Sequence, residues 1–174
     1  MTRGLMINRA PVLTLWAAVV AERLGYDRDA AATFGRTVAG KTARSKAVGL
    51  GIEKASPQRA SKPRPEPPGR LREIHLLGHM LAAVETPEGL RALSHGKPID
   101  PESVERYLED KFGDDLDDVR AAMKTLARSL PKERLAAEAY ALYEAFRPTV
   151  PRQKKGWGAE GVLDLDLIRS LAER

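Results

Sequence analysis

The chain has 174 residues, with 29 Lys and Arg against 24 Asp and Glu, no cysteine, and 43% hydrophobic residues. This length suits one compact domain or a domain with an appendage, and the hydrophobic content argues against wholesale disorder. The lack of cysteine excludes disulfides, thiolate metal sites and cysteine nucleophiles. The fold must therefore be stabilised by packing.

Positive charge is concentrated in the first part of the chain. Residues 1–75 contain 14 Lys and Arg against 6 Asp and Glu, whereas residues 76–152 contain 11 against 14. This asymmetry indicates either an anionic partner for the basic half or two faces of the protein that attract each other.

A strongly apolar stretch near the N-terminus predicts a buried helix. Residues 10–21 contain no charged side chain, follow Asn8 as a candidate N-cap and precede a stop at Gly25. The stretch is too short to span a bilayer, and Glu22 and Arg23 stand where a signal peptide would need small residues for cleavage. We therefore expect a central core helix in a cytoplasmic protein that does not associate with membranes.

Two more helices are expected before the first clear linker. One runs from Asp27 or Asp29, as its N-cap, to Gly40, and a short basic helix occupies 41–48. Residues 53–70 then contain five prolines and five basic residues, a composition typical of an extended connector. The predicted organisation is a three-helix unit at 1–52, a connector at 53–70 and a C-terminal helical unit at 71–174.

The segment 71–85 is ambiguous, because its nearly continuous apolar residues suit either a strand or a helix. We favour a strand or a hairpin that bends at Gly78. Thr86, Pro87 and Glu88 look like an N-cap, a first-turn proline and a first-turn acid, and so predict a short helix that ends at Ser94.

Three consecutive helices are expected between residues 100 and 147, because acidic caps and prolines recur at their starts. They begin at Asp100, near Asp115 and at Pro131, and their short connections favour antiparallel neighbours. The tail from Val162 onwards is expected to pack a short helix or an extended segment on this body. The predicted fold class is mainly α, with two helical units and, if 71–85 is extended, one short β-hairpin.

Histidines and aspartates are the candidate metal ligands. His75 and His79 have a spacing that would put both on one face of a helix or strand, but a zinc site needs three or four ligands. The acidic cluster at 114–118, like Asp164 and Asp166, could bind magnesium, although helix capping explains these residues fully. We therefore expect no metal site and no cofactor.

Residues 35–42 literally fit the phosphate-loop pattern G-x-x-x-x-G-K-T, with Gly35, Gly40, Lys41 and Thr42 at the required positions. A phosphate loop follows a strand and opens a helix, whereas Gly35 lies inside the expected second helix. The pattern therefore does not favour nucleotide binding.

Basic residues of the second and third helices and of the connector are the strongest indication of function. Lysine and arginine neutralise phosphates, and a flexible basic arm beside a helical unit is a common way to contact DNA or RNA. A solvated basic face is the simpler explanation, because neither a helix-turn-helix pattern nor aromatic stacking residues accompany the charges. The candidate nucleic-acid contacts are Arg36, Lys41, Arg44, Lys46, Arg59, Lys62 and Arg64.

Three segments, NRAPVLTLWAAVVAERLG, DPESVERYLEDKFG and AYALYEAFRP, resemble those of a family of uncharacterised, conserved hypothetical bacterial proteins. The resemblance covers most of the chain. It implies no activity, no cofactor and no site residue.

The hypothesis that follows is a non-enzymatic binding protein whose basic N-terminal half contacts nucleic acid. One alternative is a protein-interaction or assembly module that uses helix faces and the proline-rich arm. The apolar surplus at Trp16, Val19 and Val20 also permits a homodimer. Another is an enzyme of unrecognised type, which would need His75, His79 or the aspartates to converge in one pocket. The sequence identifies no catalytic residue.

Overall fold

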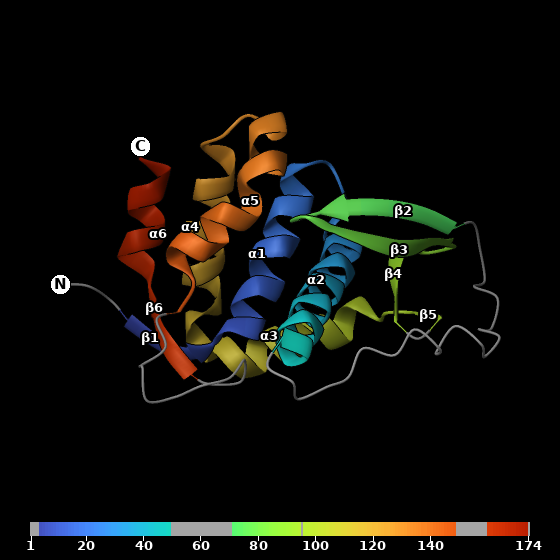
Figure 1. Ribbon diagram of the computed structural model, residues 1–174, viewed down its shortest axis with the longest axis horizontal. Helices are drawn as coiled ribbons and strands as arrows, with labels where there is room; N and C mark the ends of the chain where they lie inside the picture. Colours follow the sequence, from blue (N-terminus) through green and yellow to red (C-terminus); the bar gives the residue numbers. More distant parts are fainter. Residues whose placement is uncertain (1–3, 50–70, 95, 149–159, 174) are drawn as a thin grey trace.

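The computed structural model describes residues 4–49, 71–94, 96–148 and 160–173, with only the backbone described at 4, 8, 41–49 and 160. Helices dominate, as predicted, but a four-stranded antiparallel sheet and a two-stranded sheet accompany them, so the β content exceeds the single hairpin expected. The elements in chain order (Figure 1) are β1 (Gly4–Asn8), α1 (Arg9–Arg23), α2 (Arg28–Gly49), β2 (Leu71–Leu76), β3 (His79–Thr86), β4 (Gly89–Ser94), β5 (Lys97–Pro98), α3 (Pro101–Phe112), the 3-10 turn η2 (Gly113–Asp115), α4 (Leu116–Arg128), α5 (Lys132–Phe146), β6 (Glu160–Asp164) and α6 (Leu165–Ala172).

Helix α1 is the centre of the molecule, with α2, α4 and α5 arranged around it (Figure 1). Every side chain from Pro11 to Ala21 is buried. A helix that is apolar on all sides is stable in water only when neighbours cover its whole circumference. The predicted core helix is therefore confirmed. Because Trp16, Val19 and Val20 are covered within one chain, their burial gives no support to the predicted homodimer, which stays untested.

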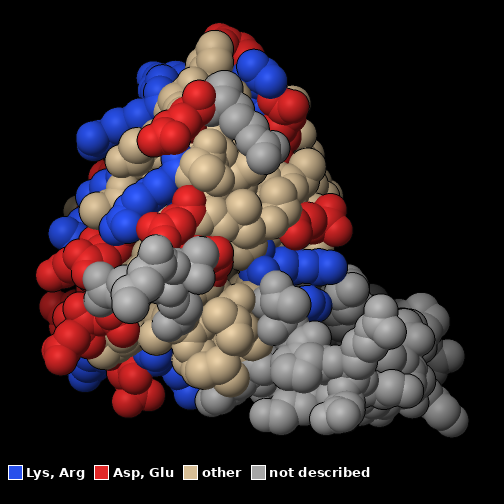
Figure 2. All heavy atoms as spheres, turned by 90° about the vertical axis from the view of Figure 1, so that its left-hand side faces the viewer, with Lys and Arg blue, Asp and Glu red and all other residues tan. Residues whose placement is uncertain are grey.

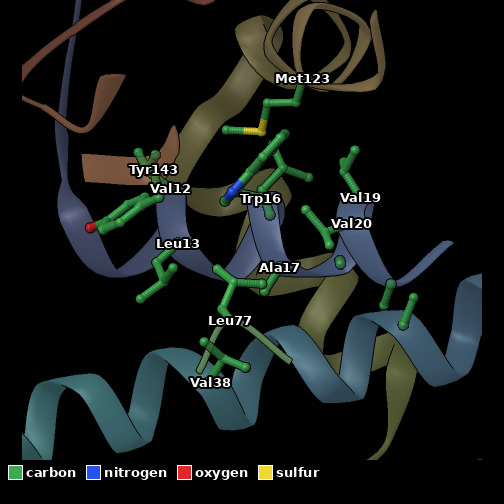
Figure 3. Close-up of a cluster of buried hydrophobic side chains, with 14 of the residues drawn as sticks. Val12, Leu13, Trp16, Ala17, Val19, Val20, Val38, Leu77, Met123 and Tyr143 are labelled. Carbon is green, nitrogen blue, oxygen red and sulfur yellow. The ribbon is translucent and has the colours of Figure 1, made fainter. Parts of the chain in front are cut away.

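The hydrophobic core is continuous across the molecule. It joins side chains of α1 and α2 to those of the β2–β3 hairpin and of α3, α4, α5 and α6. Figure 3 shows Trp16 of α1 pointing toward Met123 of α4, and places Leu77 between α1 and Val38 of α2. The connector 53–70 lies outside the described residues, so the boundary between the two predicted units stays a prediction.

Helix α2 runs without interruption from Arg28 to Gly49, so the prediction of two helices separated at Gly40 is wrong. Asp27 caps the helix, as predicted, and its carboxylate accepts a 2.7 Å hydrogen bond from the Ala30 N–H. Gly40 is exposed within the helix. A glycine inside a helix costs only about 1 kcal/mol relative to alanine, and the alanines, lysines and arginine that follow it favour helix enough to continue the chain.

The segment 71–86 folds as an antiparallel hairpin, as favoured, in which Leu76 pairs with His79. Its two-residue turn has positive φ angles, 50° at Leu77 and 77° at Gly78, which match the twist of a β-hairpin. Positive φ is unusual for leucine, but the Leu77 side chain is only 4% exposed. Burial in the core offsets the cost of this conformation, about 1–2 kcal/mol.

Residues 86–94 form a turn and strand β4, so the helix predicted there is wrong. The Thr86 hydroxyl donates to the Gly89 carbonyl oxygen at 2.7 Å and closes the turn. Proline is as favourable near the start of a turn as in the first turn of a helix, so the Thr-Pro-Glu pattern does not decide between a helix and a turn. The Ala92 N–H donates to the Thr33 hydroxyl of α2 at 2.9 Å, and this tertiary contact favours the strand.

The helices predicted in the second half are confirmed. Asp100 caps α3 by accepting a 3.0 Å hydrogen bond from the Glu102 N–H, and Gly113 follows its last residue. Asp164 likewise caps α6, and β6 before it pairs antiparallel with β1, a strand that no sequence pattern predicts.

In the part of the chain that the structure describes, no helix has the length and apolar character needed to cross a bilayer.

Candidate anion-binding site

The predicted nucleic-acid contacts are only partly described. Arg36 is exposed on α2, and its guanidinium carbon lies 4.9 Å from the ring centroid of Tyr107 on α3. This cation–π contact holds Arg36 against the protein and leaves it accessible. The basic face stays a prediction, because the side chains of the other candidates lie outside the described residues: Lys41, Arg44, Lys46, Arg59, Lys62 and Arg64.

The G-x-x-x-x-G-K-T segment at 35–42 lies wholly within α2 and follows no described strand directly. Gly35 packs against the backbone of α1, where a Cβ would lie 2.2 Å from the Thr14 carbonyl oxygen. Close helix packing therefore explains Gly35. The segment does not have the geometry of a phosphate loop.

The histidines and aspartates considered as ligands are dispersed. His75 and His79 do not share a face, because the turn between them and the register of β2 with β3 place them on opposite faces of the hairpin. The acidic cluster at 114–118 lies where α3 meets α4, whereas Asp164 and Asp166 lie at the start of α6. Among the described residues, no three His, Cys, Asp or Glu side chains form a group able to hold a metal ion.

A pocket of about 330 Å³ lies where the C-terminal ends of α1 and α4 meet the N-terminal end of α5. Val19 and Ala127, both buried, contribute its apolar lining. Its charged lining is predominantly cationic and consists of Arg23, Lys124, Arg128 and Lys132, with Glu22 as the one carboxylate. The pocket therefore has a surplus of positive charge.

Arg23 connects α1 to the loop between α4 and α5. Its Nη2 atom donates to the Leu130 carbonyl oxygen at 3.4 Å, and its Nε atom is buried without a hydrogen-bond partner among the described residues. A buried N–H without a partner raises the free energy of the folded state by about 1–3 kcal/mol. The arginine is thus held at the pocket with part of its hydrogen-bonding capacity unused.

The four cations of the pocket share with Lys97 and Lys111, the other lysines whose side chains the structure describes, the lack of an ion pair to a described carboxylate, whereas seven arginines elsewhere form one. None of the four forms an ion pair with a described carboxylate, whereas Arg134, for example, lies 2.6 Å from Glu138. On the face shown in Figure 2, basic and acidic side chains are interspersed. Like charges gathered in a concave, partly apolar site produce a positive potential that attracts an anion.

A second charged cluster joins α2, α3 and α4. Glu105 accepts hydrogen bonds from Arg28 at 2.7 Å and from Arg120 at 2.6 Å. Burial by itself opposes ionisation of Glu105, but these hydrogen bonds outweigh it and lower the pKa of its carboxyl. The adjoining cavity measures only about 30 Å³. The cluster is therefore a structural ion-pair network.

Replacing Glu105 with glutamine is expected to lower the free energy of unfolding by about 1–3 kcal/mol at neutral pH, because Arg120 would keep a largely buried charge without its partner. The pKa of folded Glu105 lies below the ordinary value of 4.5. The stabilisation is therefore fully present above that pH and is lost as the pH falls through the lowered pKa. Urea unfolding of the unsubstituted protein and of Glu105→Gln, at pH values above and below 4.5, measures this difference in the free energy of unfolding.

The control for this substitution is Glu109→Gln, an exposed change on the same helix. It is expected to alter the free energy of unfolding by less than about 0.5 kcal/mol. An equal loss in the two variants, or a Glu105→Gln loss that persists in acid, would contradict the assignment of Glu105 to a stabilising network.

Sequence patterns did not reveal the pocket, although one signal was present. Lys124, Arg128 and Lys132 recur every four residues, the spacing that aligns side chains along a helix face. They belong to the segment 76–152, whose net charge is negative, so a charge count over the segment hides them. Arg23 is far away in the sequence, and only the packing of α1 against α4 brings it near.

Comparison with known proteins provides no further guide to the site. No protein-family model matches the chain, and neither a curated protein nor a solved structure matches it. The resemblance of three segments to uncharacterised bacterial proteins stays a prediction. The function must therefore be inferred from the residues of the site.

Proposed function

We propose that the protein is a non-enzymatic binding protein that engages nucleic acid through phosphate contacts. The observation that carries the proposal is the pocket in which four cations, Arg23, Lys124, Arg128 and Lys132, accompany one carboxylate. Lysine and arginine bind phosphate oxygens through charge-assisted hydrogen bonds and release counterions from the polyanion. In this proposal Arg36 and the basic positions of α2 and the connector supply further contacts.

A binding role suits the chemistry of the lining better than a catalytic role. The described residues that line the pocket include no histidine, serine, threonine or cysteine. The lining supplies hydrogen-bond donors and positive charge, which hold an anion, but it lacks the paired nucleophile and base used in covalent catalysis. We therefore favour recognition over reaction.

Fluorescence anisotropy with double-stranded DNA, single-stranded DNA and RNA tests the proposal. Four phosphate contacts at the pocket alone predict that the affinity falls about a hundredfold between about 50 and about 200 mM salt, and the contacts of α2 and the connector would add to this fall. The variant Arg128→Gln/Lys132→Gln removes two exposed cations of the pocket. We expect it to bind more weakly and to reduce the slope of log affinity against log salt by about 2.

The matched control is Arg106→Gln/Lys111→Gln on α3, which removes the same two types of charge from exposed positions outside the pocket. A further variant with glutamine at Arg36, Lys41, Arg44 and Lys46 tests the basic face predicted on α2. Loss of binding in that variant alone would retain nucleic-acid binding and reject the pocket as its site. Absence of binding at the lower salt, or equal losses in the pocket variant and its control, would overturn the proposal.

A further inference from the structure

We infer that the pocket recognises a phosphate monoester, the group found at the end of a nucleic-acid strand or on a small phosphorylated molecule. The inference rests on the proposed function, because the two share one contact site, and it specifies which kind of phosphate that site takes. Three features support it: the charge of the lining, the position of Lys132, and the size of the pocket.

The charge of the lining suits a dianion. Four cations accompany one carboxylate, and none of the four is paired with a described carboxylate. An internal phosphodiester carries a single negative charge, whereas a phosphate monoester carries about 1.5 to 2 at neutral pH and presents three strong acceptor oxygens. A phosphate monoester therefore neutralises more of the positive charge of the pocket than an internal phosphodiester does, and its three oxygens accept hydrogen bonds from more of the cationic side chains.

Stabilisation of a helix does not explain the position of Lys132. Cations are favourable at helix C-termini, which accounts for Arg23 and Arg128 in the last turns of α1 and α4. Lys132 is the first residue of α5, where the helix dipole is positive and a cation is unfavourable, and the cap residue Pro131 adds no side-chain hydrogen bond there. A bound dianion would offset this unfavourable position by pairing with Lys132.

The size of the pocket suits a phosphate group and the carbon atoms next to it. The ends of three helices surround the pocket, and its volume of about 330 Å³ falls within the range of sites for small ligands. Val19 and Ala127 contribute a small apolar part of the lining beside the four cations.

Two oligonucleotides of identical sequence, one with a terminal phosphate and one with a terminal hydroxyl, distinguish the two kinds of phosphate. By anisotropy, we expect the strand with the terminal phosphate to bind about tenfold more tightly. Arg128→Gln/Lys132→Gln should abolish this preference, and Arg106→Gln/Lys111→Gln should retain it. Isothermal titration calorimetry with inorganic phosphate and with a nucleoside monophosphate measures binding of the free group.

The outcomes separate this inference from the proposed function. Equal affinity for the two strands, or a preference that survives in the pocket variant, overturns the inference and leaves nucleic-acid binding in place. A third outcome is calorimetric binding of inorganic phosphate or of the nucleoside monophosphate without binding of any oligonucleotide. If the pocket variant abolishes this binding, the result rejects the proposed function and supports the inference. The ligand would then be a free phosphorylated molecule. Absence of binding by every probe rejects both.

Discussion

Substitution of Gly35 with alanine is expected to lower the free energy of unfolding by at least about 3 kcal/mol. An alanine Cβ at this position would lie 2.2 Å from the Thr14 carbonyl oxygen and 3.2 Å from the Ala18 backbone nitrogen. Both atoms belong to the backbone of α1, so no side-chain rotation can relieve the overlap, and α1 is itself packed on all sides. The two helices would have to separate along their contact, which would loosen the centre of the core.

The matched control for this prediction is Gly40→Ala, the same substitution in the same helix. Gly40 is exposed, and a Cβ there would meet no atom within 4 Å, so alanine is expected to stabilise the protein by about 0.5–1 kcal/mol. Urea unfolding followed by circular dichroism measures both variants. Similar effects at the two glycines, or weaker phosphate binding without lost stability at Gly35, would contradict the role of Gly35 in helix packing.

The sequence predicted the apolar core helix α1, the hairpin at 71–86 and the helices whose ends carry local caps. Asp100 accepts a hydrogen bond from the Glu102 N–H two residues away, and Gly113 ends the same helix, so both signals are local. Gly40 and the Thr-Pro-Glu pattern at 86–88 are each compatible with two local structures. Contacts distant in sequence, such as the hydrogen bond between Ala92 and Thr33, decide between them. Such contacts have no local signal.

The candidate site could not be predicted because its residues are collected from separate segments. Lys124 and Arg128 come from α4, Lys132 from α5 and Arg23 from α1. Their convergence depends on how three helix ends pack, and a segment-wise net charge carries no information about that. The basic surplus of the first 75 residues directed attention to α2 and the connector, while the described cationic pocket draws three of its four cations from the acidic part of the chain.

Replacing Trp16 with alanine is expected to lower the free energy of unfolding by about 3–5 kcal/mol. The side chain is fully buried, and its Nε1 atom donates to the Ala139 carbonyl oxygen at 2.9 Å. Its ring also meets Phe146 edge to face, with a centroid distance of 5.2 Å. Trp16→Phe keeps an aromatic ring and leaves a smaller cavity, so it should cost only about 1–3 kcal/mol, part of it from the lost donor.

The same substitution tests whether the two predicted units unfold together. Trp16 belongs to α1, whereas Ala139 and Phe146 belong to α5, so the cavity would open inside a core that both parts of the chain share. A single transition by circular dichroism is therefore expected, with hydrogen-exchange protection falling in α5 as much as in α1. If α5 kept its full protection in Trp16→Ala, the two parts would be stable independently of each other. The continuous core would then not be the source of their common stability.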